Sequence, residues 1–265
     1  MKFPENFGSL HGHEEELRRA SIEAIVKSDV LSAHAEFIEC AMNTLNHFTH
    51  GYETEDQDKR IVQLLGIRMF NATGASLKLL LSGYYQNGAT LMRDVLETTG
   101  LVDYFALDPT RIARWRTVDD RVRWKEFQPA VVRREVGNHD DEKMRVQRNE
   151  TYRILSTYAS HPSPQGFRMI RKAPTGLHEV GPFFDGKALS ALVAETAKIM
   201  LPASTHFSIH FKLRTRVDHM TAIGFMEIRD KWGAKFFGEP FEPAKYAEMR
   251  RRVSTRFGPA AAAPN

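Results

Sequence analysis

The chain has 265 residues, of which 42% are hydrophobic and 26% charged, a composition typical of globular proteins. No apolar run is long enough to span a bilayer, and the first residues lack the apolar core of a secretory signal, so we expect neither a membrane protein nor a secreted one. A single cysteine, Cys40, excludes an internal disulfide. Together these features favour a cytoplasmic protein.

Basic charge is concentrated in one region of the chain. The net charge is +4, yet residues 111–172 hold 15 Lys and Arg against 8 Asp and Glu, which leaves the rest slightly acidic. A second basic cluster lies at residues 249–256. A local basic excess is typical of a nucleic-acid or phosphate partner, and a solvated helix face gives the same pattern. Both interpretations stay open at this point.

Apolar residues recur every three or four positions along much of the chain, which predicts α-helices. In chain order, helices are expected over residues 13–50, 59–86, 89–107, 110–127, 129–160, 186–217, 218–233 and 243–257. The segment 59–86 is apolar nearly all round and should be buried, with Gly66 and Gly74 allowing close approach of a neighbouring helix. A break is expected at 137–141.

The pattern changes after Pro162, where proline, glycine and serine become frequent. Residues 167–184 predict a β-hairpin, and Pro202 should kink or divide the helix that follows. We therefore predict a mainly all-α fold, a single domain over residues 1–257 built as a bundle of about six to eight helices with one small hairpin. Residues 258–265 are expected to form a disordered tail.

The chain lacks the common ligand-binding motifs. It has no Gly-rich phosphate loop, no HExxH and no paired cysteines, so we expect no cofactor and no metal. His206 and His210 are spaced to lie on one helix face, which metal binding can use, but two ligands do not make a site.

Two residues of the helix at 89–107, Arg93 and Glu97, share one face with Tyr104. They could form an ordinary surface ion pair, which would add a few tenths of a kcal/mol. They could also form a partly buried pair that points into a cleft. The second arrangement would make Arg93 a fixed cation for a phosphate or carboxylate, with Glu97 orienting it.

His161 follows Tyr158 at the end of an expected helix, immediately before Pro162. A helical projection places it on the seam between the apolar and the polar face, at the helix end where the dipole favours a protonated ring. This position suits a catalytic or phosphate-binding histidine. It equally suits an imidazole that caps the last helical carbonyls.

The order of elements over residues 77–167 is similar to that of bacterial helical proteins of the domain-of-unknown-function type. These resemble the HEPN superfamily, the higher eukaryotes and prokaryotes nucleotide-binding domains. The resemblance is carried by an Arg-x-x-x-Glu on one helix and a helix-terminal Ala-Ser-His-Pro on another. It implies a helical bundle, dimerisation, and links to RNA cleavage or defence.

HEPN ribonucleases pair an arginine with a histidine a few residues later, without a metal. The pair Arg153 and His161 has seven intervening residues, one more than that pattern allows. Arg214 and His219 match the spacing on a predicted helix, although matches of this kind are expected by chance. The four residues are the candidates for catalysis that this resemblance implies.

We therefore expect a helical protein that binds a nucleotide, RNA or a protein partner through a polar cleft formed by Arg93, Glu97, Tyr158 and His161. A metal-independent ribonuclease of HEPN type is one alternative. A structural subunit of a homodimer, supported by the apolar helix at 59–86, is another. The sequence leaves open whether the protein is an enzyme.

Overall fold

The computed structural model describes residues 4–160, 162–172 and 175–258. Its α-helices are α1 (Glu5–Val26), α2 (Asp29–Asn46), α3 (Gln57–Leu81), α4 (Tyr85–Leu107), α5 (Thr110–Thr117), α6 (Asp120–Phe127), α7 (Pro129–Gly137), α8 (Glu142–Leu155), α9 (Gly186–Ser208), α10 (Arg216–Phe237) and α11 (Pro243–Phe257). Two π-helices, η1 (His47–Gly51) and η2 (Ser156–Ser160), follow α2 and α8, and η3 (Gly166–Ile170) is a 3₁₀ turn. The predicted all-α class is confirmed, but six to eight helices were too few.

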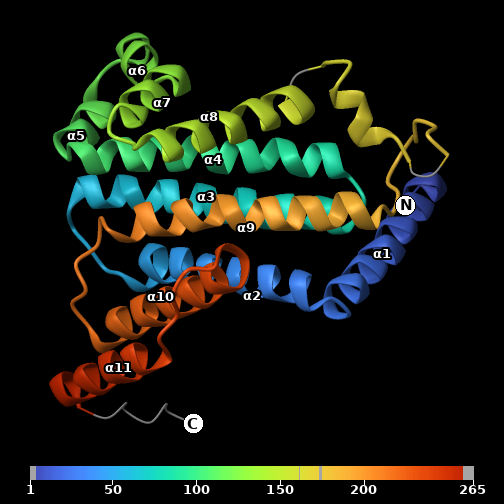
Figure 1. Ribbon diagram of the computed structural model, residues 1–265. Coiled ribbons are helices and arrows are strands. Elements are labelled where there is room, and N and C mark those ends of the chain that lie inside the picture. The colour runs from blue at the N-terminus through green and yellow to red at the C-terminus, as the bar shows by residue number, and fades with distance from the viewer. Residues whose placement is uncertain (1–3, 161, 173–174, 259–265) are drawn as a thin grey trace.

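The helices form three layers in Figure 1. α3, α4 and α9 run side by side through the middle, α5 to α8 lie above them, and α2, α10 and α11 lie below. α1 leaves the right-hand end of the body at an angle. Because α4 packs against α3, α9, α7, α8 and η2, it is the main element that joins the upper layer to the rest.

The sequence of α4 explains this central place. Its buried residues recur at helical spacing and are Tyr85, Gly88, Ala89, Met92, Val95, Thr98, Thr99, Val102, Asp103 and Phe105. A Cβ on Gly88 would lie 2.5 Å from the Leu80 side chain of α3, so only glycine permits this approach. The close contact predicted at Gly66 is also present, since a Cβ there would lie 2.4 Å from Phe207 of α9.

Capping side chains explain where the predicted helices divide. The helix expected over 13–50 divides at Ser28, whose hydroxyl accepts a hydrogen bond from the first turn of α2. The helix expected over 110–127 divides at Asp119, whose carboxylate caps α6 in the same way. The break predicted at 137–141 is confirmed, and the last of these residues caps α8.

The segment 59–86 does not form one helix. α3 ends at Leu81 because the chain turns at Gly83, where φ is +86° and a Cβ would lie 2.5 Å from the Phe183 carbonyl oxygen. Most apolar residues of α3 that were expected to support a dimer pack within the chain, against α4, α2 and α9, while Leu64 is 60% exposed. Dimerisation stays a prediction. α9 runs undivided through Pro202.

The β-hairpin predicted at 167–184 is wrong for the residues that the structure describes. They contain one isolated antiparallel bridge, between Arg171 and His178, and no strand. Pairing stops there because η3 turns the chain on one side of the bridge. On the other side the chain turns away to bury Phe183 against the Tyr85 ring, with ring centroids 5.5 Å apart.

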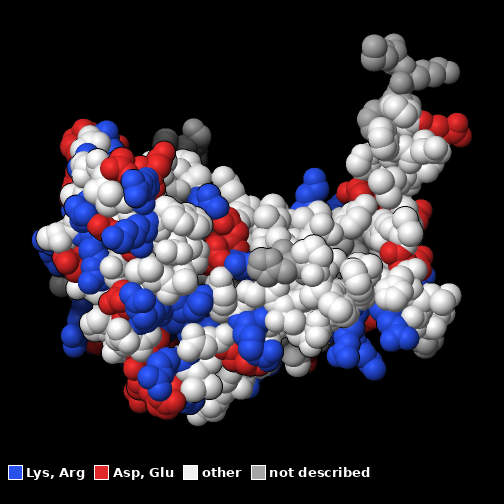
Figure 2. Space-filling model, turned by 90° about the horizontal axis from the view of Figure 1, so that it is seen from above, with Lys and Arg blue, Asp and Glu red and all other residues white. Residues whose placement is uncertain are grey.

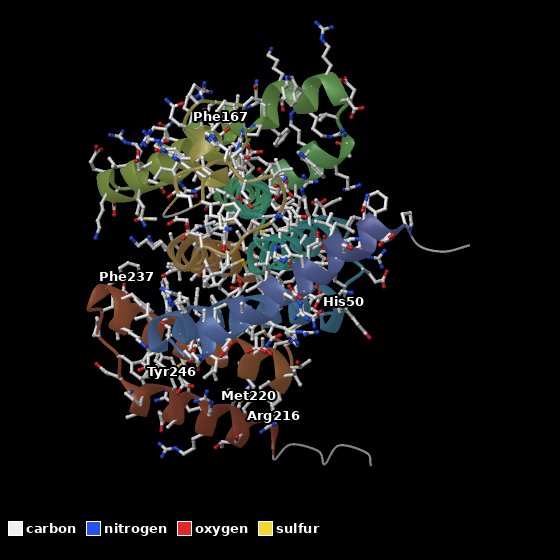
Figure 3. The ribbon with its side chains drawn as sticks, turned by 90° about the vertical axis from the view of Figure 1, so that its right-hand side faces the viewer. His50, Phe167, Arg216, Met220, Phe237 and Tyr246 are labelled. Carbon is white, nitrogen blue, oxygen red and sulfur yellow. The ribbon has the colours of Figure 1, made fainter. Side chains whose placement is uncertain are left out.

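α10 and α11 enclose a second, smaller group of buried side chains, Ile223, Tyr246 and Val253. Figure 3 shows Tyr246 and Met220 where these two helices meet. Beyond α11 only Gly258 of the expected tail is described, and residues 259–265 lie outside the described chain. Within the described chain, none of the helices combines the length and apolar character needed to cross a membrane.

Candidate functional site

Arg93 and Glu97 form the partly buried ion pair that their spacing allowed. Nε of Arg93 lies 2.9 Å from Oε1 of Glu97, and the two side chains are 18% and 26% exposed. Nη2 of Arg93 also donates a hydrogen bond of 2.9 Å to the Tyr152 hydroxyl of α8. The pair therefore differs from a surface ion pair within one helix, because Arg93 also links α4 to α8 through this hydrogen bond.

Arg133 of α7 contacts the same tyrosine. Its guanidinium carbon stands 3.8 Å from the centroid of the Tyr152 ring, and that of Arg93 stands 5.1 Å from it. Nη1 of Arg133 is buried and has no hydrogen-bond partner among the residues that the structure describes. A buried donor left without an acceptor costs about 1–3 kcal/mol, and more when it is charged. Such a donor is expected to receive an acceptor from outside the chain.

A cavity of about 30 Å³ lies beside this guanidinium. Its polar walls are Glu97, Arg133, Arg148 and Tyr152. Its other walls are Leu96, Gly100, Pro129, Val132 and Val136. One water needs about 10–15 Å³ of such space, so the cavity admits two or three ligand atoms and not a nucleotide. Phosphate or carboxylate oxygens are the groups that a guanidinium binds best.

Arg148 of α8 joins the cavity to a buried group of charges. Its Nη2 lies 3.0 Å from Oδ2 of Asp103, and its Nε lies 2.8 Å from Oδ2 of Asp140. The three side chains are 16%, 10% and 6% exposed. Asp103 also lies 2.6 Å from Nδ1 of His206 on α9. Because an ionised carboxylate only accepts, this nitrogen of His206 carries the hydrogen.

The buried charges support one another. Burial alone would raise the pKa of Asp103, but the hydrogen bonds and charges of His206 and Arg148 outweigh it, and the pKa is lowered. Burial likewise opposes the charge of Arg148, and its two carboxylate partners nevertheless raise its pKa. One turn beyond His206, burial lowers the pKa of His210, whose Nε2 lies 3.0 Å from the Val102 carbonyl oxygen. Arg148 and Asp103 are therefore charged at neutral pH.

The other residues expected at the ligand site are placed differently. Tyr158 lies in η2, is half-buried, and accepts a hydrogen bond from Gln86 at its carbonyl oxygen; it is not among the residues that line the cavity. Arg153 is exposed and pairs with Glu150 at 2.6 Å. His161 lies outside the described residues, so its partnership with Arg93 or Arg153 stays a prediction.

Arg214 and His219, the alternative catalytic pair, bind different partners. The Arg214 guanidinium stacks on Tyr52, with its carbon 3.8 Å from the ring centroid, and donates to the Glu53 carbonyl oxygen. Nδ1 of His219 lies 2.8 Å from the Thr215 carbonyl oxygen. The contacts described for these two side chains are with different partners, and a shared catalytic role for them stays a prediction.

Several residues of the cluster were not singled out from the sequence, namely Arg133, Tyr152, Arg148, Asp103 and Asp140. One signal was present. Asp103 stands in the apolar stretch LVDYFAL, and an acidic residue on a buried helix face indicates a paired charge. The remaining members carry no local signal, because they meet only through packing of α4, α7 and α8.

Comparison with known proteins does not extend these observations. No protein-family model matches the chain, and neither the curated proteins nor the solved structures gave a match. Within the described residues, no group of three His, Cys, Asp or Glu side chains is placed to hold a metal ion. The candidate site is therefore defined by its own geometry, as the arginine cluster formed by Arg93, Arg133 and Arg148 around Tyr152.

Proposed function

We propose that the protein binds RNA and that the arginine cluster receives one of its phosphate groups. The observation that carries this proposal is Arg133. Its guanidinium lies over the Tyr152 ring, its Nη1 is buried without a partner in the described residues, and it lines a small cavity. A phosphate oxygen would supply the missing acceptor and the opposite charge.

The surroundings of the cluster support a nucleic acid more than a free nucleotide. A cavity of about 30 Å³ holds the tip of a phosphate and leaves the sugar and base outside. The surrounding residues, 111–172, carry the surplus of seven positive charges. Figure 2 looks onto this side of the molecule and shows Lys and Arg, interleaved with Asp and Glu, over the α5–α8 end. The resemblance of 77–167 to HEPN-like proteins points to the same class of ligand.

Each member of the cluster has a task in this proposal. Arg133 donates to the phosphate oxygens, and the Tyr152 ring beneath it holds its guanidinium in place. The hydrogen bond from Arg93, itself held by Glu97, fixes the tyrosine hydroxyl. Arg148 adds positive charge at the cavity wall, while its partner carboxylates hold it in place.

The proposal is tested by fluorescence anisotropy with a labelled single-stranded RNA at low salt. Arg133→Gln keeps most of the side-chain volume and removes the charge, and we expect it to weaken binding about five- to tenfold, or about 1–1.4 kcal/mol. Arg153→Gln is the matched control, because this exposed arginine is already paired with Glu150. If the wild-type protein binds no RNA at low salt, the proposed function is wrong.

A metal-independent ribonuclease is the second candidate, and the Asp103–His206 contact is the observation that favours it. A carboxylate that orients an imidazole through Nδ1 leaves Nε2 available to accept a proton, as a general base requires. Incubation with RNA in EDTA tests this function. Cleavage that His206→Gln abolishes would support it, and intact RNA across pH 5 to about 9 would exclude it.

A further inference from the structure

A tryptophan on α6 is unusually exposed. Trp124 is 69% exposed, more than any other aromatic side chain in the part of the chain that the structure describes. The other tryptophan of this region, Trp115 on α5, packs against the core. A solvent-facing indole gains nothing for folding, since the large apolar surface of this side chain stays in water.

The attachment of α6 explains why Trp124 faces outward. Arg123 fixes the helix to α5, because Nε donates a 2.8 Å hydrogen bond to the Trp115 carbonyl oxygen. Phe127, one turn later on the same side, packs on Tyr104 with ring centroids 6.0 Å apart. None of the residues of α6 is fully buried. α6 therefore stands at the top of the molecule, as Figure 1 shows, with its opposite side open to solvent.

Two basic residues share this open side with Trp124. Arg121 precedes it by three positions, and Lys125 follows Arg121 by four, so the three side chains lie within about 100° of one another around the helix. Both basic residues are exposed, and neither has an ion-pair partner within the described chain. Arg114 and Arg123 nearby are instead paired with Glu126 and Asp120.

We propose that this face of α6, formed by Arg121, Trp124 and Lys125, binds an unpaired base of single-stranded RNA by stacking. The indole supplies the stacking surface and the two cations contact the adjoining phosphates. The inference rests on the proposed function and deepens it, because it makes the ligand single-stranded. A duplex buries its bases and has none to stack. α6 leads through Gln128 directly into α7, so the same strand would continue toward Arg133.

The test compares three labelled ligands of equal length, namely an oligouridylate, the same backbone without bases, and an RNA duplex. Trp124→Ala is expected to weaken oligouridylate binding about tenfold and to leave binding of the abasic strand within about twofold. Trp124→Phe should lie between. Oligouridylate should also quench a part of the tryptophan fluorescence that Trp124→Phe lacks. Phe237→Ala is the matched control, because this phenylalanine is 52% exposed on the far side of the molecule (Figure 3).

The outcomes separate the two proposals. If Arg133→Gln weakens RNA binding and Trp124→Ala does not, the stacking inference is wrong and RNA binding stands. Equal weakening of oligouridylate and abasic strand by Trp124→Ala also overturns stacking, as does a preference of the wild-type protein for the duplex. If the wild-type protein binds none of the three ligands, the proposed function is wrong and the face of α6 has a different partner.

Discussion

An arginine lies over a tyrosine ring at three separate places in the described chain, and two of them have the same distance to the ring centroid. The guanidinium carbon of Arg133 lies 3.8 Å from the Tyr152 ring centroid in the upper layer, and that of Arg214 lies 3.8 Å from Tyr52 near the start of α10. The two arginines differ in the hydrogen-bond partners of their guanidinium N–H groups. Arg214 donates to the Glu53 carbonyl oxygen, whereas Nη1 of Arg133 is buried without a partner among the described residues.

Each of these two places also holds an aspartate beside a histidine. Asp103 lies 2.6 Å from His206, and Asp218 lies 2.8 Å from His47. Asp218 accepts further hydrogen bonds from two backbone N–H groups and completes the capping box of α10, so its work is structural. The other contact described for the Asp103 carboxylate is the side chain of Arg148.

The comparison teaches that residue types and stacking distances do not by themselves identify a binding site. Around the start of α10, Asp218 and the stacked Arg214 both have partners within the described chain, although Nε of the neighbouring Arg216 is buried without one. In the arginine cluster the stacked arginine itself, Arg133, holds the unmet donor, and Arg133 also lines a small cavity. We therefore place the ligand at the cluster and regard the lower site as part of the scaffold. The predictions below test this division.

The largest effect is expected from Arg148→Ala. This change leaves the carboxylates of Asp103 and Asp140 buried without their shared cation, and removal of one partner from a buried ion pair costs about 3–5 kcal/mol. Arg153→Ala on the same helix removes an exposed pair and should cost less than about 0.5 kcal/mol. Urea denaturation measures both. Equal losses would mean that the buried charges do not hold α8.

A smaller loss is expected from Asp218→Ala, which removes the cap of α10 and the partner of His47. The expected cost is about 2 kcal/mol, and Thr215→Ala, which removes one hydrogen bond of the capping box, should cost about 1 kcal/mol. Neither change should alter RNA affinity, measured on protein that circular dichroism shows to be folded. A loss of affinity in a folded Asp218→Ala variant would contradict the structural role of the lower site.

Low pH should reduce the stability that Asp103 contributes to the arginine cluster and that Asp218 contributes to the start of α10. The pKa of Asp103 is lowered by His206 and Arg148 against the effect of burial, and the pKa of Asp218 is lowered by backbone hydrogen bonds, again against burial. An unfolded aspartate titrates near pH 3.9, so the stabilisation is complete above about pH 4 and is lost as the pH falls through the lower folded pKa. The free energy of unfolding should fall with acid, and less steeply in Asp103→Asn. An unchanged slope in that variant would contradict this assignment.

The sequence predicted the helical class and the Arg93–Glu97 pair because both depend on residues three or four positions apart. The rest of the cluster depends on long separations. The Tyr152 partner of Arg93 lies 59 residues away, and the Asp103 partner of Arg148 lies 45 residues away. The spacing of residues along a helix gives no information on contacts between segments so far apart in the sequence.

The errors in the predicted fold have local causes. The helix expected over 110–127 was divided by a cap at Asp119, which the apolar pattern does not show. The hairpin expected at 167–184 failed because Phe183 is buried against α4, and this tertiary contact draws the chain away from strand pairing. Turn residues indicated where the chain would bend, but not what it would pack against.

The central claim is that Arg133, and not Arg214, contacts a phosphate. The salt dependence of single-stranded RNA binding tests it most directly, since each phosphate contact contributes about 0.7 to the slope of log affinity against log salt concentration. We predict that Arg133→Gln lowers this slope by about 0.7 and that Arg214→Gln, at the geometrically matched site, leaves it unchanged. An unchanged slope in Arg133→Gln, or an equal change in both variants, would contradict the account.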